Sequence, residues 1–119
     1  MTEDDRGSVT AEIAVALPGL VLLTVAALWG VSVASVQLAC TDAARSGARA
    51  AARGESLPAV REAVARAVPQ GSTIEVSRDG DQTRVAVTVQ VRAPAPTGLA
   101  PLRVRAQATA VTEPGAATP

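Results

Sequence analysis

One long stretch without charge constrains this chain more than any other feature. From Ile13 to Cys40 the sequence contains no charged residue. A helix needs roughly 20 apolar residues to cross the hydrocarbon core of a bilayer, so this stretch is long enough. Its most apolar part, Leu17 to Val36, is the predicted span, and Pro18 removes one backbone hydrogen bond near its start. Because a chain of 119 residues has no second apolar layer to enclose such a helix, we expect it to lie in a membrane.

A cleaved secretory signal is the first alternative to a retained membrane helix. Such signals have a basic first region and an apolar core of roughly 7–15 residues. Here the segment Met1–Gly7 contains three acidic residues and one arginine, and the apolar stretch that follows is much longer. The sequence therefore predicts a helix that stays with the protein.

Composition argues against several classes of function. The chain has no His, and Cys40 is its only Cys. An intrachain disulfide is therefore impossible, and the usual metal sites and His-based catalysis are absent. The formal net charge is zero, which does not indicate nucleic-acid binding. We expect a protein that is not an enzyme and needs no cofactor or metal, and we leave the role of Cys40 open.

A second feature lies directly before the apolar stretch, where Arg6-Gly7-Ser8 is followed four residues later by Glu12. A cut between Gly7 and Ser8 would create an α-amine, whose ordinary pKa of about 8 keeps it mostly protonated at neutral pH. An unpaired charge in a buried site costs several kcal/mol, so Glu12 is a candidate partner for such an amine. In the simpler alternative, Glu12 only marks the water boundary of the helix, where an acid also suits the helix dipole.

Three segments resemble one protein family. Residues 6–12 resemble its leader junction, and residues 12–18 resemble its Glu-aromatic-Ala-x-x-x-Pro start, with Ile13 in place of the aromatic residue. Residues 42–52 resemble its Ala-Ala-Arg-x-Gly-Ala-Arg-Ala-Ala segment. The family is that of the TadE-like pseudopilins of tight-adherence (Flp-type) pilus systems, a branch of the type IV pilin superfamily. Many members carry a second acid in the middle of the membrane helix, but residues 29–32 contain none here.

The resemblance implies a minor pilin-like component of a pilus or a related secretion machine. A prepilin peptidase would cut after Gly7, and Glu12 would pair with the new amine of a neighbouring subunit. The implied partners are this peptidase, other pilin or pseudopilin subunits, pilus-assembly membrane proteins and membrane lipid, with no nucleic acid. The alternative is an uncleaved single-pass anchor that presents a small extracytoplasmic binding domain.

The implied orientation conflicts with the charges beside the span. In this family the leader is cytoplasmic, which would place the C-terminal domain outside the cytoplasmic membrane, possibly in an assembled pilus. The positive-inside rule counts Arg and Lys near the span. It finds Arg6 on the leader side but Arg45, Arg49 and Arg53 on the other side. We base the expected orientation on the junction and not on the charges.

Beyond the predicted span, the helix should continue through Ala52 with two distinct faces. One stripe of small residues repeats every four positions and comprises Ser35, Ala39, Ala43, Gly47 and Ala51. The three arginines beyond the span form a second stripe, about 200° away around the helix. Small side chains let another backbone approach closely, so we expect the first stripe to pack on other pilin helices. The alternative is a solvated Ala-rich helix.

The remainder predicts a small head. Gly54 should end the long helix, and a second helix should start at Ser56 or Leu57, with Pro58 in its first turn. Alternating polar and apolar residues predict strands at 73–78, 85–92 and 102–110. The expected fold is α+β: a long hydrophobic helix, a short helix and a three-stranded antiparallel sheet. The expected divisions are a leader at 1–7, the membrane helix and its extension at 8–53, the head at 54–112 and a disordered tail at 113–119.

Overall fold

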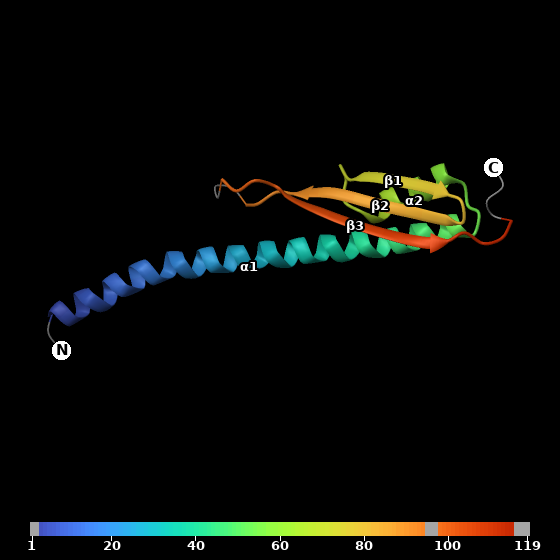
Figure 1. Cartoon of the computed structure of the whole chain (residues 1–119). Coiled ribbons are helices and arrows are strands. Elements are labelled where there is room, and N and C mark those ends of the chain that lie inside the picture. Colours follow the sequence, from blue (N-terminus) through green and yellow to red (C-terminus); the bar gives the residue numbers. More distant parts are fainter. Residues whose placement is uncertain (1–2, 95–97, 116–119) are drawn as a thin grey trace. The chain divides into compact units, whose positions relative to one another are not determined.

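A computed structural model describes residues 3–94 and 98–115. It contains the helices α1 (Glu3–Ala52) and α2 (Leu57–Ala67) and the strands β1 (Thr73–Asp79), β2 (Gln82–Val91) and β3 (Leu102–Val111), as Figure 1 shows. The predicted α+β fold is confirmed. The chain divides into two compact units, Met1–Ser32 and Val33–Pro119.

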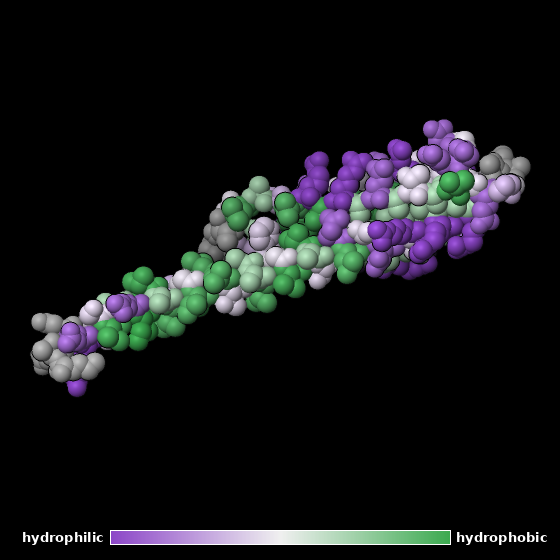
Figure 2. Space-filling view, turned by 60° about the horizontal axis from the view of Figure 1, so that its bottom comes forward, coloured by the Kyte–Doolittle hydropathy of each residue, from purple (hydrophilic) through white to green (hydrophobic). Residues whose placement is uncertain are grey.

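The first unit is the N-terminal part of α1. Nearly all of its described side chains are exposed, including Leu20, Leu23 and Leu28. Figure 2 shows apolar residues along the visible face of this part of the helix, with hydrophilic residues near its N-terminal end. Among the described residues this is the one helix long and apolar enough to cross a membrane. Polar side chains here bond to their own helix, since the Thr24 hydroxyl donates to the Leu20 carbonyl at 2.8 Å.

The end of α1 and the start of α2 follow the local signals in the sequence. Gly54 has a φ of 96°, a conformation that favours glycine, and its N–H donates to the Ala51 carbonyl. Ser56 is the N-cap of α2 and accepts a hydrogen bond from the Ala59 N–H at 3.3 Å. The predicted helix stop and the predicted start at Leu57 are confirmed.

The three strands form one antiparallel sheet in the order β1-β2-β3. Val85 of β2 lies opposite Val76 of β1 and Ala108 of β3. The predicted strands are confirmed with small shifts. Pairing of Asp79 with Gln82 extends β1 by one residue and starts β2 three residues earlier, because Gly80 at φ 58° permits a tight turn.

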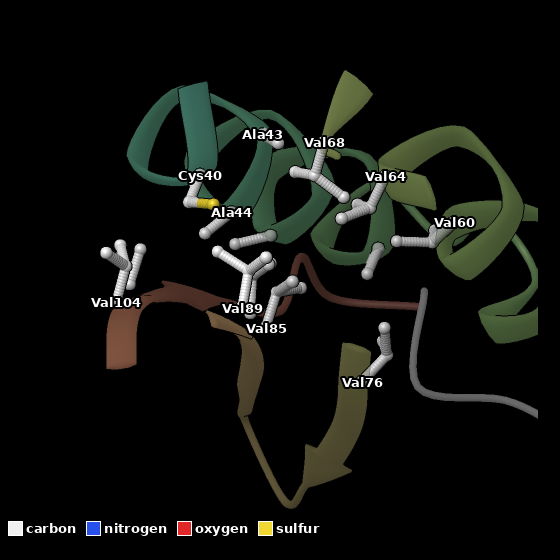
Figure 3. Close-up of a cluster of buried hydrophobic side chains, with 14 residues drawn as sticks. Cys40, Ala43, Ala44, Val60, Val64, Val68, Val76, Val85, Val89 and Val104 are labelled. Carbon is white, nitrogen blue, oxygen red and sulfur yellow. The ribbon is translucent and has the colours of Figure 1, made fainter. Parts of the chain in front are cut away.

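The core of the second unit is built from small side chains and valines. Val60 and Val64 of α2 face Val85 and Val87 of β2, and each is at most 2% exposed. Figure 3 shows the valines of the sheet directed toward both helices. Alanines and Cys40 supply the α1 side of this core. No aromatic side chain belongs to this described core, so the area available for hydrophobic burial is modest.

The expected division between the helix and the head, at residue 53, stays a prediction. Residues 33–52 of α1 pack with α2 and the sheet in one compact unit. The reason is that Ala44, Ala48 and Ala51 let the α1 backbone approach the valines closely. The expected leader at 1–7 remains a prediction.

The start of the expected tail is tied to the head. The Glu113 N–H donates to the Ala52 carbonyl at 3.0 Å, and the buried hydroxyls of Thr83 and Thr112 lie 2.9 Å apart. Ordered structure therefore extends past residue 112, because these bonds satisfy backbone and hydroxyl groups at the C-terminal end of α1. Residues 116–119 of the expected tail lie outside the described residues.

Gly47 provides a test of the packing between α1 and α2. A Cβ added at Gly47 would lie 2.6 Å from Val64 Cγ2, closer than real contacts allow. We expect Gly47→Leu to lower the free energy of unfolding of the head by about 1–3 kcal/mol, because overpacking displaces α2. Thermal unfolding of the full chain in detergent, followed by circular dichroism, measures this change.

The matched control is Gly30→Leu, which exchanges the same residues where a Cβ would meet nothing within 4 Å. It should leave the unfolding of the head unchanged. Equal midpoints for Gly47→Leu and the unaltered chain would show that the helices do not pack as described.

Arg78 provides a second test, at the C-terminal end of α1. Its Nη2 donates to the Ala51 carbonyl at 2.7 Å, and α1 leaves such carbonyls without helical partners. We expect Arg78→Met to lower the free energy of unfolding by about 1.5–3 kcal/mol, the usual range for a hydrogen bond from a charged group. Urea unfolding measures the change, with the exposed Arg84→Met as a control that should cost less than about 0.5 kcal/mol.

Candidate processing and assembly site

The junction predicted from the sequence lies on the first turns of α1. Gly7 and Ser8 are exposed, and a Cβ added at Gly7 would meet nothing within 4 Å. Both residues are helical in this structure, with the neighbouring Thr10 hydroxyl donating to the Arg6 carbonyl at 3.0 Å. No described residue covers the junction.

Glu12 lies one helical turn after Ser8 and is also exposed. Residues four apart on a helix are neighbours on one face, so the Glu12 carboxylate is within reach of the position that a new Ser8 amine would occupy. Within the described part of the chain, Glu12 has no ion pair or hydrogen bond through its side chain. Its carboxylate is therefore available to an amine of its own chain or of a neighbour.

The small-residue stripe lies partly against the head and partly at the surface, and its packing on other pilin helices stays a prediction. Ala43 and Ala51 are at most 5% exposed, and Gly47 lies against Val60, Val64 and Val85 of the same chain. This half of the stripe is thus occupied by the chain's own head. Ser35 is exposed and Ala39 is half-buried, so the N-terminal part of the stripe remains available to another helix. A four-residue repeat of small residues predicts close packing but does not identify the partner.

The basic stripe lies at the surface as expected. Arg45, Arg49 and Arg53 are exposed, and Arg53 Nη2 lies 3.5 Å from Glu55 Oε1. Such an exposed ion pair contributes little to stability. Cys40, whose role was left open, is fully buried among the alanines and valines of the core. It acts there as a small apolar residue.

Two polar contacts near the end of the predicted span were not anticipated. Gln37 Nε2 donates to the Arg105 carbonyl at 3.3 Å, and the Thr41 hydroxyl donates to the Gln37 carbonyl at 2.8 Å. The first bond joins α1 to β3 across a long sequence separation, and no local pattern indicates it. It places the start of β3 beside the residues that follow Val36.

The described residues offer little to a cofactor. They contain no group of His, Cys, Asp and Glu side chains that could hold a metal ion. A groove of about 80 Å³ between α1 and α2 is lined mainly by alanines and valines and has no charged side chain in its lining.

Comparison with known proteins agrees with the segments described above. A family model described as TadE-like protein matches residues 7–49, so it starts at the junction glycine and ends beneath the sheet. The apoptosis inhibitor Rv3655c of Mycobacterium tuberculosis is 42% identical over 107 residues, covering 87% of this chain and 78% of the relative. No solved structure matches the chain. The exposed junction, the apolar helix and this similarity together show that the chain belongs to the TadE-like family.

Proposed function

We propose that this protein is a minor pilin-like component that a prepilin peptidase processes and that serves in assembly of a tight-adherence type pilus or a related secretion machine. The observation that carries the proposal is the exposed Gly7–Glu12 junction directly before an apolar helix surface that no described residue covers. Membership of the TadE-like family supports it. The partners of this role are the peptidase, other pilin or pseudopilin subunits and assembly proteins of the membrane.

Processing would remove the charges of the leader and create a new positive charge at Ser8. Removal of residues 1–7 takes away the acids of the leader and leaves an amine on Ser8. That amine needs a carboxylate when it enters a membrane or a packed fibre, because a buried unpaired charge is costly. Glu12 is the first acid after the cut. Pairing with a neighbour's Glu12 would couple processing to assembly, so only cut subunits would join stably.

The proposed orientation places the leader in the cytoplasm and the head outside it. Cleavage by the native peptidase tests this orientation as well, because that enzyme acts on the cytoplasmic side. The arginines at 45, 49 and 53 then lie outside, against the usual charge bias. Their exposure on the helix beside the head makes them available to an acidic partner or to lipid headgroups.

The mycobacterial relative favours a second candidate. Its name describes an apoptosis inhibitor, and its similarity to this chain extends beyond the family model into the head. The second candidate is therefore an inhibitor of apoptosis, as the name of that relative states. Recovery of the chain from culture medium without pilus subunits would favour this candidate, and recovery only in membranes or pili would favour the first.

Gly7 provides the direct test of processing. In cells with the native peptidase, we expect the intact mass and N-terminal sequence to show a chain that starts at Ser8. Gly7→Val should abolish this cut and leave the longer membrane protein, because the peptidase of this family requires glycine there. Gly19→Val makes the same exchange at another exposed glycine of α1 and should be processed normally. A stable unaltered chain that starts at Met1 or Thr2 would instead support the uncleaved anchor.

Glu12 provides the test of assembly. We expect Glu12→Gln to be cut normally but to cross-link with neighbouring pilin subunits at least about tenfold less, because the Ser8 amine loses its partner. Quantitative mass spectrometry of cross-linked membranes measures this loss. The control is Asp42→Asn, which removes an exposed acid further along the same helix. Normal assembly of Glu12→Gln and Glu12→Ala would show that the pairing role is wrong.

A further inference from the structure

The end of the sheet formed by the start of β3 and the end of β2 carries an uncompensated basic surface. From Gln82 to Thr112 the sequence contains arginines but no acidic residue. Arg92, Arg103 and Arg105 are exposed and lie near one another, because Gln90 pairs with Arg103 and Thr88 with Arg105. None of the three makes an ion pair within the described part of the chain. Their charges are therefore available to an anionic partner.

An open depression lies between two of these arginines. It has a volume of about 420 Å³, and its lining is mainly polar. Arg92 and Arg103 line it together with hydroxyl and amide groups from Thr73, Thr88 and Gln90. Guanidinium groups bind phosphate oxygens with two parallel hydrogen bonds, and hydroxyl and amide groups can complete such a site. The depression therefore suits a phosphate group.

Exposed leucines stand beside this basic surface. Leu99 precedes β3 and is 61% exposed, and Leu102, the first residue of β3, is 44% exposed. Figure 2 shows apolar residues at one end of the sheet, next to a row of hydrophilic side chains. Because side chains alternate along a strand, Leu102 lies on the face of Val104 and Arg103 on the opposite face, so this end of the sheet has an apolar side and a basic side, as surfaces that enter the interface of a bilayer do. The arginines would meet the headgroups while the leucines reach the acyl boundary.

The same end of the sheet lies where the chain leaves the membrane. Val33 and Val36, at the end of the predicted span, pack partly against the core of the second unit. The bond from Gln37 to the Arg105 carbonyl places the start of β3 at this level. The predicted span ends at Val36, so lipid headgroups would surround this region in a membrane. The basic surface thus lies at the level where its arginines would meet lipid headgroups.

We propose that Arg92, Arg103 and Arg105, with Leu99 and Leu102, form a lipid-docking surface that holds the head against a bilayer containing anionic phospholipids. The ligand is the phosphate group of the lipid. This contact would orient the head on the membrane before assembly, and a subunit leaving the membrane would have to break it. The proposal needs the membrane helix but not the cut after Gly7.

Depth measurements on the full chain in vesicles test this proposal. A Cys40→Ala background carries one new cysteine, either Leu99→Cys at the docking surface or Asp81→Cys at the opposite end of the sheet, labelled with an environment-sensitive fluorophore. The vesicles are phosphatidylcholine with or without a one-third share of phosphatidylglycerol, and nitroxide groups on the acyl chains quench labels that enter the bilayer. We expect strong quenching at position 99 only with phosphatidylglycerol, and none at position 81.

Charge variants separate lipid docking from other effects. Each arginine near an anionic surface contributes roughly fivefold to the ratio of docked to free head, so the triple Arg92→Gln, Arg103→Gln, Arg105→Gln should lower this ratio roughly a hundredfold. High salt should lower it as well. The control triple Arg61→Gln, Arg66→Gln, Arg84→Gln removes the same charge from exposed positions elsewhere and should change the ratio little.

Three results would overturn the proposal. The first is equal quenching at position 99 with and without phosphatidylglycerol. The second is an equal effect of the two arginine triples. The third is a label at position 99 that becomes shielded only when each vesicle holds many copies of the protein. That result would show that the surface binds a second subunit. None of these results bears on cleavage after Gly7, because the vesicles contain no peptidase.

Discussion

The close approach of the α1 backbone to the valines of the sheet and of α2 is the contact on which the head depends. It exists because Gly47 has no side chain and because alanines occupy the neighbouring core positions. Without large aromatic side chains, this core can reach native packing density only if the backbones come close together. At the edge of this core, the side chain of Arg78 and the backbone N–H of Glu113 donate hydrogen bonds to carbonyls at the C-terminal end of α1.

The N-terminal part of α1 has the opposite character. Its apolar side chains are exposed along its described length, so they require lipid or other apolar partners that this chain does not supply. The junction precedes this surface directly. A cut there would change the charge at the end of a helix that already needs a partner. One helix thus carries the predicted junction, an exposed apolar surface and one wall of the head.

Much of the fold could be predicted from local patterns. Alternating valines identified β2, Gly54 identified the end of α1, and Ser56 with Pro58 identified the start of α2, because each signal acts within a few residues. The stripe of small residues predicts close packing on other subunits, which stays a prediction, while Gly47 in this stripe lies against valines of the same chain. The four-residue repeat of small side chains shows which face of the helix packs closely, but it does not identify the partner of that face. The bond between Gln37 and Arg105 was beyond such reasoning, because it joins residues far apart in the chain.

The sequence by itself determined the long charge-free helix, the junction with Glu12 and the order of the elements, because hydrophobicity, charge and turn chemistry act locally. Only the tertiary structure decided that residues 33–52 of α1 pack with the head and that Arg92, just after β2, lies near the arginines at the start of β3. Strand register and the packing of small residues bring distant segments together. These depend on the fit of whole surfaces, and no single segment of sequence contains that information.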